Sequence, residues 1–540
     1  MKNGSCNGGL LVSVEDSRAL DAEAQADWGF NAFALIEAAG RLCAEAAAKA
    51  CAETNPDLFK NKPMITVAAG TGNNAADALA MLRYYILSSM TDASLSTVIL
   101  SRRPKEDDGG PCVELLHSLK KMKVPVFAWD EAEGLHADNY LALSDIIIDG
   151  IAGTGLSGGL HGTPEEMANA INTVRNSSAL TCKKPLVVSV DLPSGASDQW
   201  ALGMPVVKAD LTLAIEPRKY CLYTPAARLY GGKIVPVKGV FPKELIASYR
   251  GAELLEWDSA GEKVGKIRQD VHKNERGTVE IRAGSPGATG AAVIAGRGAQ
   301  AAGAGLVRLV VDDGIYPIVA SRASSGIMVV PSGVAPVDMT KGASAVGTSA
   351  DGIYTDAVLL GPGWGWAESR AKEFEKALSL EKAGAPLILD ADAIELARGV
   401  VFNGNAIMTP HPGEFSRLTG IDKDKLLIRP VPILLDYSRK YNAVIVFKGH
   451  VITIAAPDGR VGVVDGMLPG LASGGSGDLL AGFTAGIAAG MARRGGFDAY
   501  DCAAAAAALL IASGRRFKAR FTDPLEIACG AADLAGEAWL

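Results

Sequence analysis

The sequence lacks three features that would each point to a particular class of protein: a basic charge excess, paired cysteines and a long apolar run. Its net charge of −7 excludes nucleic-acid binding by bulk electrostatics, although local cationic positions can still hold a phosphorylated small molecule. Its eight cysteines include no C-x-x-C pair. In a chain of this length, that pattern indicates reduced thiols and excludes a disulfide framework or a zinc site.

The N-terminal residues contain no apolar stretch of signal-peptide length. The longest weakly polar stretches, residues 479–492 and 502–512, are shorter than the ~20 residues of a membrane-spanning helix. They are rich in Ala and Gly, and we predict that they form buried helices. We therefore expect a cytoplasmic, soluble protein that binds small molecules and has no nucleic-acid or membrane partner.

The sequence does have length and a repeated α/β pattern. Its 540 residues exceed the roughly 250–300 residues that a single core reaches, so we predict two domains, residues 1–255 and 256–540. Short, continuous apolar runs alternate with helical stretches such as residues 32–52 and 164–174, which indicates parallel strands covered on both faces. The polar segment from Glu256 is interpreted as a linker or as the first segment of the second domain. Predicted strands begin at Met64, Ser96, Asp145, Leu186, Leu211, Thr278, Gly305, Ala357, Pro386, Ala443 and Val451.

Both domains are thus predicted to be α/β, the first as a Rossmann-like, doubly wound sheet. Ligands of such sheets bind beyond the carboxyl ends of the strands, so the residues after each run are the site candidates. In LASGGSGDLLAGFTAGIAAG, from Leu471, a glycine-rich turn feeds into an apolar helix. Backbone N–H groups and the positive helix end would meet near Gly475, which suits a phosphate.

Asp478 stands at the same turn and would be repelled by a resting phosphate. Its predicted role is that of a base on a hydroxyl group that attacks the phosphorus. The alternative is that Gly474, Gly475 and Gly477 only turn the chain and that Asp478 caps the helix.

The GGSGD turn resembles the signature of the ADP- or ATP-dependent NAD(P)H-hydrate dehydratases, which have a ribokinase-like fold. Six further segments also match that family, in its order, beginning at Ala283, Gly303, Leu359, Leu387, Met408 and Val446. The resemblance implies that ADP or ATP, with Mg²⁺, phosphorylates the hydroxyl group of a hydrated nicotinamide ring. Loss of phosphate then restores NADH or NADPH. Both nucleotides and both hydrates are compatible with it.

By this resemblance, Asp478 matches the catalytic aspartate. A lone histidine is more often a satisfied structural residue, and only the motif context favours His411 as a ligand. Asp390 and Asp392 could bind a metal, and Asp392 could instead cap the following helix. The implied hydrate-binding residues are Ala291, Gly363, His411 and Asp478, and the implied nucleotide-binding residues are Lys448, Gly449, His450, Val451, Ile452, Gly475 and Gly477.

Three strand-end motifs of the first half begin at Val67, Asp145 and Val187 and resemble those of the NAD(P)H-hydrate epimerases over residues 17–239. The resemblance implies a K⁺ site of Asn74, Asp149 and Ser194, and a proton-moving, catalytic role for Asp191. The turn over residues 153–159 could hold a pyrophosphate. The alternative for Asp191 is a strand-ending turn with an Asx cap. The implied hydrate-binding residues are Asn73, Asn74, Ala75, Ala76, Asp77, Gly153, Thr154, Gly155, Leu156, Ser157, Gly158, Gly159 and Asp191.

The first of these motifs departs from the family pattern GxGNNGGDG, because Ala75, Ala76 and Ala78 replace glycines. If those glycines have positive φ or let the backbone approach the ligand, each Cβ costs about 1 kcal/mol and narrows the pocket. We therefore expect a folded but weakened epimerase site.

Together, the two resemblances identify the chain as a member of the bifunctional NAD(P)H-hydrate repair enzymes, expected to form a homo-oligomer. The competing interpretation is a ribokinase-like kinase of another small molecule, with an N-terminal, non-catalytic binding module.

Overall fold

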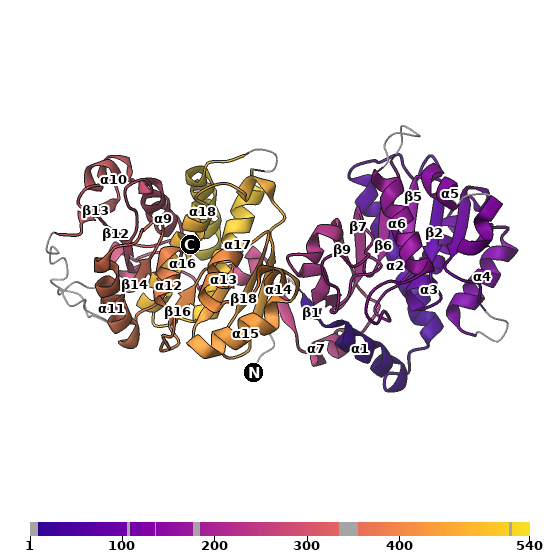
Figure 1. Cartoon of the computed structure of the whole chain (residues 1–540), viewed down its shortest axis with the longest axis horizontal. Helices are drawn as coiled ribbons and strands as arrows, with labels where there is room; N and C mark the ends of the chain where they lie inside the picture. The colour runs from indigo at the N-terminus through magenta and orange to yellow at the C-terminus, as the bar shows by residue number, and fades with distance from the viewer. Residues whose placement is uncertain (1–8, 105–108, 135–136, 177–183, 334–354, 518–520) are drawn as a thin grey trace. The chain divides into compact units, whose positions relative to one another are not determined.

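A computed structural model describes residues 9–104, 109–134, 137–176, 184–333, 355–517 and 521–540 (Figure 1). The chain divides into two compact units, one over Leu10–Gly251 and the other including Ala252–Leu540, here called the N-terminal and the C-terminal unit. The division lies a few residues before the predicted boundary at residue 255.

The N-terminal unit is built on a fully parallel sheet with the strand order β4-β3-β2-β5-β6-β7-β9. The order reverses between β2 and β5, which makes a doubly wound sheet, as predicted. A separate parallel pair joins β1 (Leu10–Val12) to β8 (Arg218–Lys219). The strands of the sheet are β2 (Ile65–Ala69), β3 (Ser96–Leu100), β4 (Val126–Ala128), β5 (Ile146–Gly150), β6 (Leu186–Val190), β7 (Leu211–Ile215) and β9 (Lys233–Val237).

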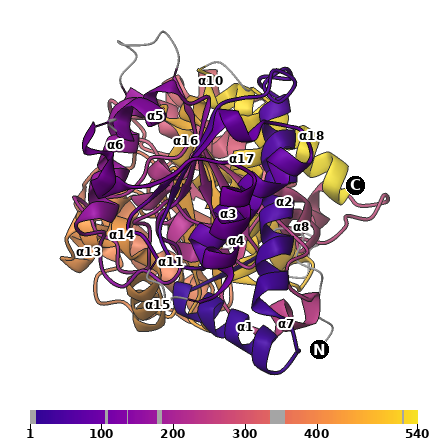
Figure 2. The ribbon, with the colours of Figure 1, turned by 90° about the vertical axis from the view of Figure 1, so that its right-hand side faces the viewer.

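Helices cover both faces of this sheet because its strands are apolar on both sides. In Figure 2, α2 (Ala32–Ala52), α3 (Asn73–Leu87) and α4 (Pro111–Lys121) lie on one side of the strands. Helices α5 (Ala137–Leu143) and α6 (Thr163–Asn176) lie on the other. Two further helices, α1 (Val14–Ala26) and α7 (Lys243–Ser248), contact each other.

The C-terminal unit has a mixed sheet with the strand order β13-β12-β11-β14-β15-β16-β17-β18-β19-β10. Its pairs are parallel except where β18 meets β17 and β19, so the predicted strand from Val451 is antiparallel to its neighbours. The strands are β10 (Ala252–Leu254), β11 (Thr278–Arg282), β12 (Leu306–Val311), β13 (Ile327–Pro331), β14 (Ala357–Leu360), β15 (Leu387–Leu389), β16 (Ala406–Met408), β17 (Val444–Phe447), β18 (Val451–Ala455) and β19 (Val461–Asp465).

Two helical layers enclose this sheet, so the α/β prediction is confirmed for both units. One layer consists of α8 (Trp257–Glu262), α9 (Thr289–Ala301), α16 (Ser476–Arg493), α17 (Ala499–Arg515) and α18 (Pro524–Trp539). The other consists of α11 (Glu368–Lys382), α12 (Asp392–Leu396), α13 (Pro412–Thr419), α14 (Lys423–Ile428) and α15 (Pro430–Tyr441). Helix α10 (Tyr316–Arg322) packs beside α9 and β13.

The polar segment from Glu256 belongs to the C-terminal unit, and its interpretation as a linker is wrong. Its helix α8 packs against α17 and α18. The Trp257 ring lies 5.7 Å from that of Trp539, whose indole N–H donates to the Gly261 carbonyl at 2.9 Å. Within this segment mainly the short helix α8 is buried. The rest is largely exposed, which explains the polar sequence.

The two Ala/Gly-rich stretches form the buried helices α16 and α17, as predicted. Among the described residues, no helix is long and apolar enough to cross a membrane. The six described cysteines are free thiols, of which Cys529 is exposed and Cys43, Cys51, Cys112, Cys221 and Cys502 are buried. Cys6 and Cys182 lie outside the described residues.

Candidate functional site

The N-terminal unit has a cavity of about 760 Å³ along the carboxyl edge of its sheet. Residues directly after four of the parallel strands line it, with one more in the segment after a fifth strand, which is where open α/β sheets bind ligands. These residues are Gly70 after β2, Ser101 after β3, Ile151 after β5, Asp191 after β6 and Val240 in the segment after β9.

Helix α3 points its N-terminus at this cavity. The residue before the helix is Gly72, and no side chain caps the first turn. The backbone N–H groups of the first turn therefore lack helical acceptors, and the positive end of the helix dipole faces the space that Gly72 and Asn73 line. This end of the cavity suits an anionic group of a ligand.

Asp149 is fully buried at the end of β5 and is held by donors from a neighbouring strand and turn. It accepts hydrogen bonds from the Ser194 N–H at 2.9 Å, the Ser194 hydroxyl at 2.5 Å and the Ser189 hydroxyl at 2.7 Å. Burial raises the pKa of Asp149, and the hydrogen bonds from Ser194 and Ser189 oppose that shift. The carboxylate is thus a buried negative charge without a cationic side chain among its hydrogen-bond donors.

Asn74 lies beside this group with both atoms of its side-chain amide buried and, within the described part of the chain, without a hydrogen-bond partner. A Cβ on Gly153 would come within 2.8 Å of the Asn74 Cβ, and the Ser194 Oγ lies 3.0 Å from the Ala152 carbonyl oxygen. Amide, hydroxyl and carbonyl oxygens therefore gather around a buried carboxylate, which is the ligand chemistry of a hard cation. The predicted K⁺ residues Asn74, Asp149 and Ser194 fit such an ion.

Asp191 ends β6 with φ +62°, a strained conformation for a non-glycine residue. Its Oδ1 accepts a hydrogen bond from the Lys219 Nζ at 2.6 Å and from the Ile215 N–H at 3.1 Å. Lys219 is buried and also donates to the Ile215 carbonyl at 3.1 Å. The carboxylate therefore bonds to distant residues, and these contacts contradict the Asx-cap alternative.

Asp77 is the third ionisable group of this part of the cavity, and the residue is 9% exposed. Among the described residues, its carboxyl group has no hydrogen-bond or ion-pair partner. Burial, together with the nearby carboxyl groups of Asp191 and Asp21, raises its pKa well above the usual value, against the effect of Lys219.

The strain expected at the three alanines of this motif is absent, because Ala75, Ala76 and Ala78 lie inside helix α3, where alanine is the best helix former. Ala75 lines the cavity, whereas Ala78 packs into the core. Of the predicted hydrate-binding residues, the cavity brings together Asn73, Asn74, Ala75, Asp77, Gly153, Thr154, Gly155, Leu156 and Asp191. It leaves Ala76, Ser157, Gly158 and Gly159 outside its lining.

Sequence reasoning missed several lining residues, of which Lys219 is the most important chemically. Lys219 follows β7 closely, so the rule of strand ends could have found it. Ser17, Arg18 and Asp21 come from helix α1, where no strand end marks them.

In the C-terminal unit, Asp478 occupies the first turn of α16. Gly475 precedes the helix with φ +96°, and no side chain caps its N-terminus, so the alternative that Asp478 caps this helix is wrong. Burial and the carboxyl groups of Asp390 and Glu414 raise the pKa of Asp478 to about 7, although Lys448 opposes this shift. A carboxyl group with such a pKa can accept a proton near neutral pH.

Lys448 follows β17 and lies beside the same helix end, because a Cβ on Gly477 would be 3.4 Å from its Nζ. The Nζ lies 2.5 Å from Asp390 Oδ1 and 3.8 Å from Glu414 Oε2. Burial would lower the pKa of Lys448, but these carboxylates outweigh it and raise the pKa. The lysine is therefore a permanent cation next to the helix N-terminus.

The predicted nucleotide-binding residues that follow Lys448 differ in their exposure to solvent. Gly449 is exposed and His450 is half-buried in the turn between β17 and β18. Val451 and Ile452 are buried, and their backbones pair with β19. The turn is therefore the accessible part of this segment.

His411 caps helix α13. Its Nδ1 accepts the N–H groups of Gly413 at 2.9 Å and Glu414 at 3.3 Å, and the Glu414 carboxylate accepts the His411 N–H at 2.8 Å. Burial lowers the pKa of His411, so the neutral ring carries its proton on Nε2, 3.2 Å from Glu414 Oε1. His411 therefore has a structural role as the cap of α13. Through Glu414, it also connects this cap to the charged groups around Lys448.

Gly363 turns the chain with φ +55° directly against helix α9. A Cβ at this position would lie 2.8 Å from the Ala291 Cβ, so these two predicted hydrate-binding residues are in contact. The Ser285 hydroxyl donates to the Gly363 carbonyl at 2.9 Å, and the Gly365 N–H donates to Asp392 at 2.8 Å. Asp392 thus holds the 361–365 turn and does not cap α12 through its side chain.

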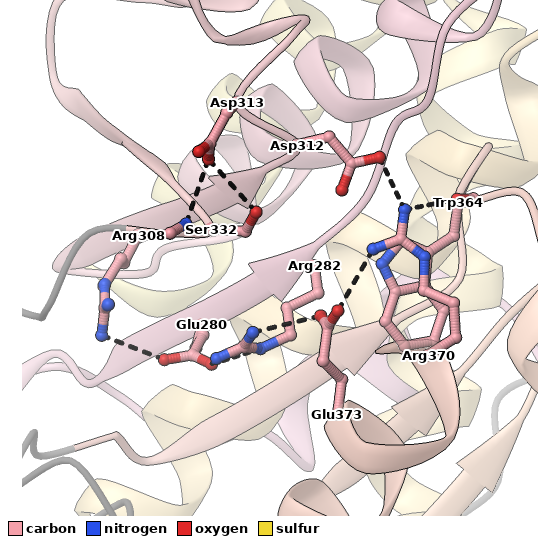
Figure 3. Close-up of polar contacts among 10 residues, drawn as sticks. Glu280, Arg282, Arg308, Asp312, Asp313, Ser332, Trp364, Arg370 and Glu373 are labelled. Carbon is pink, nitrogen blue, oxygen red and sulfur yellow. Dashed lines mark hydrogen bonds and ion pairs between the residues drawn. The ribbon is translucent and has the colours of Figure 1, made fainter. Parts of the chain in front are cut away.

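A network of charged side chains fixes the same turn from the other side (Figure 3). Arg370 donates to the Trp364 carbonyl at 2.9 Å and to Asp312 at 2.8 Å, and its guanidinium lies 4.8 Å from the Trp364 ring. Glu373 joins Arg370 to Arg282 at distances of 3.2 and 3.1 Å. Buried ion pairs contribute little net stability but hold geometry, so the Gly363 turn is preorganised.

Within the described residues, no group of three or more His, Cys, Asp or Glu side chains could hold a metal ion. Asp390 pairs with Lys448 and accepts the Thr409 hydroxyl at 2.6 Å, while Asp392 bonds to the 361–365 turn. The two aspartates therefore bind different partners, and the structure does not bring them together as a metal site of their own.

Comparisons with known proteins match both halves of the chain. The family NAD(P)H-hydrate dehydratase matches residues 279–531, and the family YjeF-related protein N-terminus matches residues 32–221. A bifunctional NAD(P)H-hydrate repair enzyme of Thermofilum pendens is 31% identical over 491 residues, covering 88% of this chain and 87% of the relative. A protein of the same name from Gloeobacter violaceus is 32% identical over 434 residues, 78% of each chain.

A ribokinase-like superfamily protein of Enterococcus faecalis V583 is among the similar solved structures. It is 23% identical, with a TM-score of 0.46, and the match covers 54% of this chain and 98% of that protein.

Proposed function

The chain belongs to the family of bifunctional NAD(P)H-hydrate repair enzymes, and from this premise we propose how its two units divide the repair. The C-terminal unit dehydrates the S form of hydrated NADH or NADPH with the help of ADP or ATP. The N-terminal unit interconverts the R and S forms, so that the whole damaged pool reaches the dehydratase.

The observation that carries the dehydratase assignment is Asp478, a carboxyl group with a pKa of about 7 at an uncapped helix N-terminus beside Lys448. The helix end and Lys448 attract the phosphates of the nucleotide. Asp478 removes the proton of the hydrate's hydroxyl group as its oxygen attacks the terminal phosphorus. The C–O bond to the phosphate then breaks with its electron pair on oxygen, the neighbouring ring carbon loses a proton to solvent, and the ring regains its C=C bond.

Ala291, Gly363 and His411 surround the hydrate in this proposal, and Lys448, Gly449, His450, Val451, Ile452, Gly475 and Gly477 surround the nucleotide. Mg²⁺ neutralises phosphate charge when it is bound. Within the described residues no group of three His, Cys, Asp or Glu side chains is placed to hold a metal ion, so Mg²⁺ would be held mainly by the phosphates of the nucleotide. ADP and ATP both fit this scheme.

In the N-terminal unit, Asn74, Asp149 and Ser194 hold K⁺, and the first turn of α3 with the turn from Gly153 holds the pyrophosphate of the substrate. The orphaned amide of Asn74 beside the buried Asp149 supports the cation. The helical setting of Ala75 removes backbone strain as a reason for a weakened site, while its Cβ still lines the cavity, and we propose that the epimerase is active. Cytoplasmic location and self-association into a homo-oligomer stay predictions.

Repair of a mixture of R and S hydrates should go to completion in the presence of K⁺ and should stop in its absence when the S form is exhausted. The purified chain is incubated with Mg²⁺ and ADP or ATP, with either K⁺ or choline as the monovalent cation, and restored NADH absorbance is followed. Asp149→Asn should abolish the K⁺ effect, because it removes the buried charge. Asp57→Asn, an exposed aspartate paired with Lys60, should not. Complete repair without K⁺ would overturn the cation assignment.

The dehydratase should lose activity as the pH falls through about 7, because only ionised Asp478 can accept a proton. The measurement is kcat/KM for the pure S hydrate against pH. Glu414→Gln should move the midpoint to lower pH, since it removes a negative neighbour and keeps the cap of α13. Lys448→Met should move the midpoint to higher pH. A flat profile from pH about 6 to about 8 would contradict the role of Asp478.

A further inference from the structure

Asp77 stands out among the acidic side chains of the N-terminal unit, because it is buried without a partner. It projects from the second turn of α3 into the cavity, and 9% of it is exposed. Within the described residues, no donor or cation bonds to it. A buried carboxyl group normally has such partners, and one that lacks them and opens into a cavity is arranged for a group that the ligand brings.

Asp191 lines the same cavity but, unlike Asp77, has a cationic partner among the described residues. Its Oδ1 lies 2.6 Å from the Nζ of the buried Lys219, and the Ile215 N–H donates to the same oxygen. Asp191 is thus ion-paired with a buried lysine. Asp77 and Asp191 come from different elements, helix α3 and the turn after β6, and both line the same cavity.

We propose that Asp77 is a second catalytic residue of the epimerase, acting as a proton donor to the hydroxyl group of the hydrate while Asp191, held by Lys219, accepts a proton from water on the other face of the ring. The proposal rests on the proposed epimerase function and deepens it. It assigns the two carboxyl groups complementary roles and makes Lys219 a positioning residue.

The chemistry balances without an oxidant or reductant. The hydroxyl group of the hydrate sits on a carbon bonded to the ring nitrogen. Asp77 gives its proton to that oxygen, the C–O bond breaks with its electron pair on oxygen, and water leaves. The nitrogen lone pair forms a C=N bond in the resulting cation. Water then adds to the other face, and Asp191 takes its proton.

The reverse direction uses the same two groups with their roles exchanged, as required for an enzyme that interconverts mirror configurations at one carbon. One proton is therefore shared between the two carboxyl groups, and it returns from Asp191 to Asp77 before the next turnover. Pairs of carboxyl groups whose environments separate their proton affinities perform this kind of acid–base work in other enzymes.

The charged groups around Asp77 agree with its proposed role as the proton donor. Burial is the main cause that raises its pKa, and the carboxyl groups of Asp191 and Asp21 add to it, while Lys219 opposes it. Asp21, from α1, is half-buried and also has a raised pKa, mainly through burial. Cys43, from α2, is a buried thiol in the same field. These groups favour the protonated form of Asp77.

The test follows R-to-S interconversion by the full-length chain in H₂¹⁸O, with the uncatalysed exchange subtracted. We expect one solvent oxygen to enter the hydrate for each inversion, because the original oxygen leaves as water. Asp77→Asn should lower kcat for interconversion about 10²–10⁴-fold with little change in KM, since an amide cannot give the proton. Asp57→Asn is the matched control and should behave like the unaltered chain.

The pH profile separates catalysis from structure. The unaltered epimerase should lose activity at high pH as Asp77 ionises. Lys219→Met should lower kcat with little change in KM, because Asp191 loses the contact that holds it. An unchanged thermal unfolding curve of the Asp77→Asn protein shows that the N-terminal unit is folded, and its dehydration of the S hydrate shows the same for the C-terminal unit. Inversion without ¹⁸O incorporation, or an Asp77→Asn variant at full rate, overturns the proposal. If the unaltered chain does not interconvert the hydrates at all, the proposed function fails instead.

Discussion

Asp478→Asn should reduce dehydration of the S hydrate about 10²–10⁴-fold while the protein stays folded. Asparagine has the same shape, but its amide cannot accept the proton of the attacking hydroxyl group. Because the Asp478 side chain does not cap α16, this substitution removes no helix cap. It also removes a carboxyl group that shares a small volume with those of Asp390 and Glu414, so stability should be unchanged or slightly higher.

The measurement is kcat for NADH formation from pure S hydrate with saturating ADP or ATP, beside a thermal unfolding curve. Asp424→Asn is the matched control, because Asp424 is exposed at the start of α14, away from the site. Nucleotide affinity of the Asp478→Asn variant should be retained, because the phosphates bind through Lys448 and the helix end. A variant that keeps a tenth or more of the activity would show that another group removes the proton.

Gly482→Val should prevent stable folding of the C-terminal unit or lower its stability by about 3–5 kcal/mol. Helices α16 and α9 approach each other closely enough that a Cβ on Gly482 would lie 2.3 Å from the Ala295 carbonyl oxygen. Gly486 repeats this contact one turn later, at 2.4 Å from the Ala299 carbonyl oxygen. Backbone cannot move aside as a side chain can, so the helices must separate.

This effect is measured by denaturant unfolding, in which the loss of dehydratase activity and the loss of the helical signal are followed together. The control is Gly536→Ala in α18, where a Cβ meets only the end of the Leu540 side chain at 3.9 Å. That substitution should be neutral or stabilising by up to about 1 kcal/mol, because alanine favours the helix. Because Gly482 lies one turn after Asp478, partial separation of the helices should also displace the catalytic carboxyl group. Equal stability of the two variants would contradict the close packing.

The longer buried strands could be predicted because both faces of a parallel sheet demand apolar side chains. The runs from Met64 and Asp145 became β2 and β5 almost residue for residue. Some short strands escaped, such as β4 (Val126–Ala128), whereas β15 (Leu387–Leu389), equally short, was found because a motif follows it. The antiparallel direction of β18 could not be predicted either, because the apolar content of a strand does not show in which direction it runs.

The candidate site shows the same division. Asp191 and Lys448 could be proposed from the sequence because each follows a strand. Topology brings such residues to the carboxyl edge of their own sheet. The pairing of Asp191 with Lys219 could not be proposed, since it depends on where a later segment folds back. Ala75 misled the prediction for a related reason: the sequence shows the lost glycine but not that its backbone is helical.

The buried thiols described for the fold have a chemical consequence for durability. Burial raises the pKa of Cys51 and Cys112 to about 11, and burial together with the carboxyl groups of the epimerase cavity raises that of Cys43 well above its usual range. Oxidation by peroxide and exchange with disulfides both require the thiolate as the attacking group, and these side chains hardly form it. An enzyme that mends an oxidation-prone cofactor thus keeps these five thiols, including the one nearest its epimerase chemistry, in the form that resists oxidation.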